Sequence, residues 1–223
     1  MRDGSGTASR GPRGRLITFE GGEGAGKSTQ LSLLAKALKK RGVDVVETRE
    51  PGGSPGAEAI RALLLDPENK GWPAMTEALL HFAARCDHMS RVVEPALASG
   101  KWVLCDRFTD STMAYQGVAQ GLGSSVIEQL SALTLKGRKP DLTIVLDLDP
   151  EIGLKRISER GDAPTRYDLM DIAFHRRLRE AFLMIVRSDP GRCVVVDATY
   201  SEDFVAEMVS GAVTSRLEMD LAS

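Results

Sequence analysis

One segment combines glycines with a lysine and a serine at a fixed spacing. Residues 21–28 read Gly-Gly-Glu-Gly-Ala-Gly-Lys-Ser and match the pattern G-x-x-x-x-G-K-[ST]. Glycines let the backbone curl so that its N–H groups converge on phosphate oxygens, Lys27 can reach the β- and γ-phosphates, and Ser28 can coordinate a bridging Mg²⁺. We therefore expect a P-loop for ATP or GTP. The expected phosphate-binding residues are Gly21, Gly22, Glu23, Gly24, Ala25, Gly26, Lys27, Ser28 and Thr29.

Two further groups of charged residues fit phosphoryl transfer. Asp106 and Arg107 follow an expected strand, where the acid can help to hold Mg²⁺ and the arginine can face phosphate. Three arginines flank a break at Gly161: Arg156, Arg160 and Arg166. A mobile arginine that closes over a nucleotide stabilises the charge of the transferring group and excludes water. For any one of the three, a solvated helix face remains an equal alternative.

The elements that must position these residues alternate along the chain. Apolar runs predict strands at 15–20, 43–48, 102–105, 142–148 and 193–196, and helical periodicity predicts helices at 28–41, 57–65, 74–98, 124–136, 150–160, 168–187 and 201–213. This alternation indicates a three-layer α/β P-loop fold, with a five-stranded parallel sheet and helices on both faces. Ligands then bind beyond the C-terminal ends of the strands. We expect residues 1–14 to be a flexible tail, 15–223 one domain, and about 156–168 a short lid.

Composition narrows the classes of function. The net charge of −2 argues against a nucleic-acid surface, and no run of 18 apolar residues could span a membrane. Residues 1–14 contain no apolar stretch of the kind found in a secretory signal. The three cysteines, Cys86, Cys105 and Cys193, have no metal-binding spacing, so we expect reduced core cysteines in a cytoplasmic protein.

Several segments beyond the P-loop resemble the thymidylate kinase family, in its bacterial form. They are 18–28 (TFEGGEGAGKS), 48–53 (TREPGG), 82–85 (FAAR), 106–107 (DR), 114–117 (AYQG), 140–143 (PDLT) and 153–156 (GLKR). The resemblance runs from about Leu16 to Val213. It implies ATP-dependent phosphorylation of dTMP to dTDP with Mg²⁺, a step towards dTTP for DNA replication. It also implies a homodimer, for which the 74–98 helix is a candidate interface.

The resemblance also implies roles for individual residues. Catalytic roles fall on Lys27, Glu23, Arg107 and a lid arginine, with Arg166 as first choice and Arg160 next, because position 24 is Gly and not Arg. Ser28 and Asp106 would hold Mg²⁺, partly through water. The acceptor would be bound by Arg49, Glu50, Arg61, His81, Phe82, Arg85, Arg107, Thr112, Tyr115 and Gln116. Within this set, Arg49, Arg61 and Arg107 would face phosphate, Arg85, Thr112 and Gln116 the thymine ring, and Tyr115 the deoxyribose.

Two positions depart from the family pattern. His81 stands where the family usually has a Phe that stacks on thymine, and Phe82 follows it. In the lid, residues 165–168 (TRYD) stand where an acid usually precedes the arginine. Adenine contacts are expected near residues 197–199.

Other functions remain open on the residues alone. A GTPase would need N-K-x-D, but Asn69-Lys70 is followed by Gly71-Trp72. A P-loop kinase for a deoxynucleoside or another monophosphate would share the phosphate cradle. A nucleotide-binding regulator without catalysis is the third possibility, although Lys27, Ser28, Asp106 and Arg107 are all intact.

Overall fold

A five-stranded parallel sheet forms the centre of the protein, in a computed structural model that describes residues 13–66, 68, 71–161, 164–219 and 221. The strands are β1 (Leu16–Glu20), β2 (Val45–Arg49), β3 (Trp102–Asp106), β4 (Leu142–Asp147) and β5 (Cys193–Asp197), and their order across the sheet is β2-β3-β1-β4-β5. All neighbouring pairs are parallel. The predicted α/β fold is therefore confirmed, and the order places β1 and its P-loop in the middle of the sheet.

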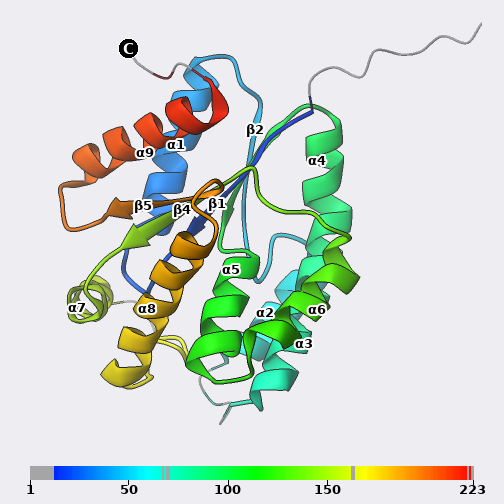
Figure 1. The fold of residues 1–223 in the computed structure, drawn as a ribbon, viewed down its shortest axis with the longest axis vertical. Helices are drawn as coiled ribbons and strands as arrows, with labels where there is room; N and C mark the ends of the chain where they lie inside the picture. Colours follow the sequence, from blue (N-terminus) through cyan, green and yellow to red (C-terminus); the bar gives the residue numbers. More distant parts are fainter. Residues whose placement is uncertain (1–12, 67, 69–70, 162–163, 220, 222–223) are drawn as a thin grey trace, which may run out of the picture.

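Helices cover both faces of the sheet (Figure 1). Helices α1 (Lys27–Lys40) and α9 (Glu202–Leu217) pack on one face, where Ile17 and Phe19 of β1 point into the core. Leu16 belongs to a different core cluster on the opposite face, because successive strand residues alternate between faces. That face carries α8 (Ile172–Ser188) and the segment formed by α3 (Ala74–His88), the π-helical turn η1 (Met89–Val93) and α4 (Glu94–Ala98). The remaining helices are α2 (Pro55–Leu65), α5 (Thr109–Thr112), the π-helical η2 (Met113–Ala119), α6 (Ser124–Leu135) and α7 (Pro150–Arg160).

The predicted helix at 74–98 is continuous in direction but not regular. Its middle turn is π-helical, with Pro95 just beyond it at the start of α4. The apolar residues of this helix are only partly buried: Met75 and Leu79 are 41% and 50% exposed, and Cys86 is exposed as well. The prediction of a core Cys86 is therefore wrong, because α3 turns Ala78, Phe82 and Ala84 inwards and leaves the Cys86 side of the helix uncovered. Cys105 and Cys193 are buried, as expected, and neither forms a disulfide.

The helix after the lid begins later than predicted, and one segment contains helices that were not predicted. Helix α8 begins at Ile172 and not at residue 168, because the Asp171 side chain accepts a hydrogen bond from Phe174 N and caps the helix there. The sequence predicts no element in residues 107–123, whereas the structure has α5 and η2 in this segment. These short helices carry Thr112, Tyr115 and Gln116.

Parts of the expected tail and of the expected lid lie outside the described residues. Residues 1–12 of the expected tail fall there, and so do residues 162–163 of the expected lid. Gly14, the last residue of that tail, donates a backbone hydrogen bond to Leu97 O at 3.1 Å. Among the described helices, none is both long enough and apolar enough to cross a membrane.

Candidate active site

The P-loop turns between β1 and α1 with its lysine folded back over it. Lys27 Nζ donates to the carbonyls of Gly21 and Gly22, at 3.3 and 2.7 Å. Burial, followed by repulsion from Arg107, lowers the pKa of Lys27 to about 8. The ammonium group is thus held at the cradle before nucleotide arrives, in a position to meet the terminal phosphates.

Position 24 of the P-loop is restricted to glycine by a neighbouring helix. Gly24 has φ +69°, and a Cβ there would lie 2.1 Å from Gly153 O. Gly153 of α7 is equally constrained, because its own Cβ would lie 2.2 Å from Glu23 O. The two backbones therefore touch, which leaves no room for an arginine at position 24. This geometry agrees with the expectation that any catalytic arginine comes from the lid.

Ser28 and Asp106 meet at the C-terminal edge of the sheet. Ser28 Oγ donates to Asp106 Oδ2 at 2.6 Å, although 78 residues separate them in the chain. Both are oxygen donors and lie next to the phosphate cradle, which is the ligand type that Mg²⁺ prefers when substrate phosphates complete its coordination. The residues present therefore fit a magnesium ion.

Arg107 occupies a strained backbone position, and one backbone carbonyl and two side chains hold its guanidinium. Its φ is +72°, a region that non-glycine residues rarely adopt and that occurs most often at functional sites. Nη1 donates to Gly21 O at 3.0 Å and to Ser111 Oγ at 3.1 Å, and Nη2 donates to Glu23 Oε1 at 3.1 Å. The Tyr115 hydroxyl also donates to Glu23 Oε1. The guanidinium is consequently fixed beside the P-loop.

Glu23 and Glu20 respond differently to burial beside these cations. Burial raises the pKa of Glu23, but Arg107 and Lys27 outweigh burial and the net shift is downwards. Burial and then the charge of Asp110 raise the pKa of Glu20 to about 8. Glu20 accepts hydrogen bonds from Phe108 N at 2.7 Å and Ser111 Oγ at 2.5 Å. Glu23 is thus an anion in the site, and Glu20 serves to hold the chain that carries Arg107.

A cavity of about 420 Å³ lies between the P-loop and residues of α2, α3, α5 and η2. Its volume is within the size range of small-molecule sites. Most residues expected from sequence line it: Glu23, Gly24, Lys27, Ser28, Arg49, Glu50, Arg61, His81, Arg85, Asp106, Arg107, Thr112, Tyr115, Gln116 and Arg160. Seven expected residues are absent from this lining: Gly21, Gly22, Ala25, Gly26, Thr29, Phe82 and Arg166. The first five belong to the P-loop and the start of α1, whose backbone surrounds the phosphate cradle.

One wall of the cavity carries a buried donor and a buried acceptor without partners. Arg85 is 2% exposed and Gln116 is 1% exposed. Arg85 Nη1 and Gln116 Oε1 make no hydrogen bond to any described residue. The Gln116 amide orientation follows from Glu77, whose Oε2 accepts from Gln116 Nε2 at 3.1 Å and cannot donate as a carboxylate. A ligand edge with one acceptor and one donor would satisfy both atoms.

His81 lines the cavity, while Phe82 does not. Phe82 is 2% exposed and packs against Ala78 and Ile127. Burial, followed by repulsion from Arg85, lowers the pKa of His81 to about 3, so its ring is neutral. His81 Nε2 lies 3.3 Å from the hydroxyl of Tyr167, which belongs to the lid segment.

The lid arginines occupy different environments. Arg160 is exposed at the end of α7 and lines the cavity. Arg166 does not line the cavity; its Nη2 lies 2.5 Å from Glu77 Oε1, and its guanidinium lies 4.7 Å above the Tyr167 ring. Arg156 donates to Ala198 O at 3.4 Å, which brings α7 beside the loop expected to contact adenine. Only Arg160 of these three lines the cavity.

Arg49 and Arg61 line the end of the cavity near β2. Arg49 Nη2 pairs with Glu58 Oε1 at 3.0 Å, and Arg61 Nη1 donates to Pro51 O at 2.7 Å. Burial lowers the pKa of Arg61, with repulsion from Arg49 as the next contribution. Two arginines that repel one another in a cavity are suited to an anionic group between them.

Several residues that shape the cavity are not expected from the sequence. Phe108, Ser111 and Tyr167 all line it. Phe108 and Ser111 lie within five residues of the Asp106-Arg107 pair. Their proximity to this motif in the sequence could therefore have indicated a place in the site. Tyr167 adjoins Arg166, but nothing in its neighbourhood in the sequence indicates that its hydroxyl reaches Gln116 at 3.2 Å.

Known proteins share both the sequence and the fold. A family model described as "Thymidylate kinase" matches residues 19–209. The chain is 53% identical over 211 residues to a thymidylate kinase of Bradyrhizobium sp. (strain ORS 278), with 93% of each chain covered. It is 52% identical over 205 residues to one of Caulobacter vibrioides, covering 92% of this chain and 98% of the other. The crystal structure of thymidylate kinase from Ehrlichia chaffeensis superposes with a TM-score of 0.74 at 37% identity, over 91% of this chain and 99% of that one. The chain therefore belongs to the thymidylate kinase family.

Proposed function

We propose that this protein transfers the γ-phosphoryl group of ATP to dTMP, giving ADP and dTDP. The observation that carries the choice of acceptor is the pair of unpartnered buried atoms in the cavity wall, Arg85 Nη1 and Gln116 Oε1. Thymine offers a carbonyl acceptor at O4 beside an N–H donor at N3. Cytosine offers the opposite polarity at these positions, which would leave both protein atoms buried without partners.

The sugar and phosphate of dTMP would lie between Tyr115 and the arginines. Tyr115 is 5% exposed, with Arg107 5.1 Å above its ring, so its bulk leaves little space for a 2′-hydroxyl on a ribose placed there. Arg49, Arg61 and Arg107 would meet the acceptor phosphate. Because that phosphate is already an anion near neutral pH, the transfer needs no general base.

Rate enhancement would come from positioning and charge stabilisation. Lys27 and Arg107, which both donate to Gly21 O, would contact the transferring phosphoryl group. A lid arginine would add a third cation beside the transferring group and exclude water. Arg160 is the better placed of the candidates because it lines the cavity. Glu23 would hold Arg107 and Tyr115 in position through its Oε1.

We also propose Mg²⁺ as the metal of the reaction, held by Ser28 and Asp106, partly through water. When bound, Mg²⁺ neutralises charge on the β- and γ-phosphate oxygens. Ser28 and Asp106 are already 2.6 Å apart, so the protein contributes two preset oxygen ligands. ATP and Mg²⁺ are thus the expected co-substrate and cofactor, and the cytoplasm is the compartment where we place the enzyme.

A homodimer is part of the proposal. Met75 and Leu79 on α3 are 41% and 50% exposed, and Leu133 on the neighbouring α6 is 76% exposed. Apolar side chains grouped on adjacent helices are typical of an interface between copies. We expect sedimentation to give twice the chain mass and Leu79→Glu to give the monomer. A wild-type protein that sediments as a monomer at micromolar concentration would contradict the proposal.

The reaction is tested by coupled ADP release with ATP and Mg²⁺. The acceptors dTMP, dUMP, dCMP, dGMP, AMP and thymidine are compared side by side, with Lys27→Ala as the matched inactive control. We expect turnover with dTMP to exceed that with dCMP and AMP by at least about 100-fold, because cytosine and adenine present the reversed polarity and misplace two buried hydrogen bonds. We expect dGMP to be poor because its purine ring is larger, and thymidine to be poor because it lacks the phosphate that Arg49, Arg61 and Arg107 would bind. Strong turnover with dCMP, dGMP or AMP would overturn the assignment of the base pocket.

A further inference from the structure

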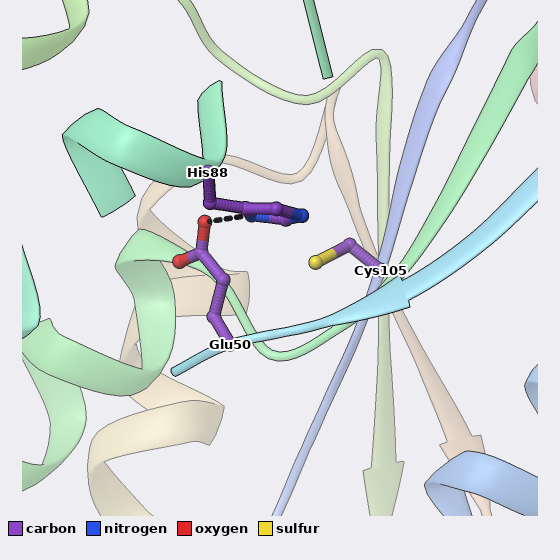
Figure 2. Close-up of side chains that lie close together, drawn as sticks. All are labelled: Glu50, His88 and Cys105. Carbon is purple, nitrogen blue, oxygen red and sulfur yellow. Dashed lines mark hydrogen bonds and ion pairs between the residues drawn. The ribbon is translucent and has the colours of Figure 1, made fainter. Parts of the chain in front are cut away.

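A chain of buried side chains leads from β2 to the cavity wall. Thr48 Oγ1 lies 2.7 Å from His88 Nε2, and His88 Nδ1 lies 3.0 Å from Glu50 Oε1. Glu50 Oε2 accepts from Arg85 Nε at 2.6 Å. Figure 2 shows the His88 ring directed at the Glu50 carboxylate, with Cys105 of β3 beside them. The side chains of Arg85, Glu50 and His88 are 2%, 3% and 0% exposed.

The hydrogen bonds in this chain have a defined direction. The Glu50 carboxylate can only accept, so His88 Nδ1 carries a proton and donates to it. In the neutral ring, Nε2 then accepts from the Thr48 hydroxyl. At the other end, Arg85 Nη2 donates to Phe108 O and Thr112 Oγ1, both at 3.1 Å. Of the three guanidinium nitrogens of Arg85, only Nη1 has no partner among the described residues.

We propose that His88 is a positioning residue that sets the acceptor affinity of this enzyme by holding Arg85 through Glu50. His88 occupies Oε1 of Glu50, which leaves only Oε2 for Arg85. Without the imidazole, Oε1 would be a buried acceptor in need of a donor. The guanidinium already bonded to Oε2 offers such donors, since Arg and carboxylate favour a two-point pair. Its rotation towards Oε1 would turn Nη1 away from the base.

Packing around the imidazole supports this role. A Cβ on Gly53 would lie 2.4 Å from Thr48 Oγ1 and 2.7 Å from His88 Cδ2 and Nε2. Gly53 has φ +82°, which itself favours glycine. The backbone at Gly53 therefore closes directly over the contact between Thr48 and His88, and the ring has no space to swing away from Glu50.

A metal site is the competing interpretation of the same residues. Ligand atoms of Glu50, His88 and Cys105 all lie within 4.8 Å of one another, and all three residues are buried. Two of these atoms already bond to each other, and Cys105 Sγ donates to Arg107 O at 3.1 Å. The Arg85 cation on the same carboxylate would repel a metal ion. The positioning role needs His88 and not Cys105, whereas a metal site needs both.

The test rests on the proposed function, so wild-type turnover with dTMP is measured first. We then compare His88→Leu, His88→Asn and Thr48→Val, with Cys105→Ala and the exposed Arg91→Ala as controls. Asn retains a donor near the position of Nδ1, while Leu removes it. We expect His88→Leu to raise the KM for dTMP by about 10- to 100-fold, with kcat and the KM for ATP within about threefold. His88→Asn should recover much of this loss, and Thr48→Val should show a smaller loss.

Selectivity provides the measurement that a purely structural role would not change. The ratio of kcat/KM for dTMP to that for dCMP should fall at least about tenfold in His88→Leu and stay at the wild-type value in both controls. If His88→Leu does not fold, the same ratio in His88→Asn and Thr48→Val decides the question.

Three results would overturn the inference. One is an unchanged dTMP to dCMP ratio in the His88 and Thr48 variants that fold. Another is an equal loss in Cys105→Ala. The third is one equivalent of zinc in the purified protein that is lost in Cys105→Ala. Absence of wild-type turnover with dTMP would instead refute the proposed function, and dTMP affinity measured by calorimetry would then be the readout for His88.

Discussion

Replacement of Arg166 by alanine is expected to lower the stability of the protein, whereas replacement of Arg160 by alanine is expected to lower kcat. Arg166→Ala leaves the Glu77 side chain, which is 1% exposed, without its cation. Removal of one partner from a buried ion pair costs about 3 to 5 kcal/mol. Gln116, Gln120 and Tyr167 still donate to Glu77, so we expect the lower end, about 3 kcal/mol, and a fall in Tm of about 6 to 12 °C for a chain of this length.

Arg160→Ala should leave Tm unchanged and reduce kcat. Arg160 is exposed and makes no hydrogen bond or ion pair to a residue in the described part of the chain, so its loss removes no native contact there. An arginine that stabilises a transferring phosphoryl group is worth about 10³- to 10⁵-fold in kcat. We expect at least about 10³-fold for Arg160→Ala and less than about tenfold for Arg166→Ala, measured at a temperature well below both transitions.

The two variants are compared by ADP release and by thermal unfolding, and Glu77→Gln combined with Arg166→Ala is the control. Because the double variant removes both charges, it should regain about half or more of the stability lost in Arg166→Ala. A 10³-fold loss of kcat in Arg166→Ala at unchanged Tm, with Arg160→Ala nearly as active as wild type, would refute this reasoning. It would mean that Arg166 leaves Glu77 and enters the cavity during turnover.

Three further predictions concern residues of the cavity. Lys27→Ala should lower kcat by about 10²- to 10³-fold without loss of helix content by circular dichroism, and retained turnover would contradict the P-loop mechanism. Because the pKa of Lys27 is lowered to about 8, the cation that binds phosphate is present below this pH; kcat/KM for ATP should therefore fall above pH 8, and a flat profile to pH 9.5 would contradict this role. His81→Phe should keep or improve dTMP binding, since a neutral ring at this position can stack on a base; loss of activity would show that the contact with Tyr167 is the one that matters.

Local features of the site could be predicted from sequence because their cause is local. The P-loop requires glycines, a lysine and a serine within eight consecutive residues, and the strand and helix on either side are visible as apolar runs. Parallel strands then bring Ser28 and Asp106 to one edge of the sheet, since ligand sites lie beyond the C-terminal ends of such strands. The resemblance to thymidylate kinases supplied the acceptor residues that this rule does not reach.

Pairings between distant residues could not be predicted in the same way. Glu50 and His88 are 38 residues apart, and Glu77 and Arg166 are 89 apart. Each partner taken alone resembles an ordinary charged residue on a helix or loop. The segment that forms α5 and η2 also gave no periodic signal, because it turns Thr112, Tyr115 and Gln116 inwards through polar contacts rather than through an apolar stripe.

The same pairings explain how an arginine-rich cavity can exist in a chain with a net charge of −2. Arg49, Arg85 and Arg107 each have a carboxylate partner, at 3.0, 2.6 and 3.1 Å. These partners hold the guanidinium groups in place and offset their mutual repulsion before a ligand binds. An incoming phosphate therefore meets donors that are already oriented, so little reorganisation is needed when the transition-state charge develops. Arg160 has no such carboxylate partner among the described residues, and an exposed arginine at a helix end is the one expected to move.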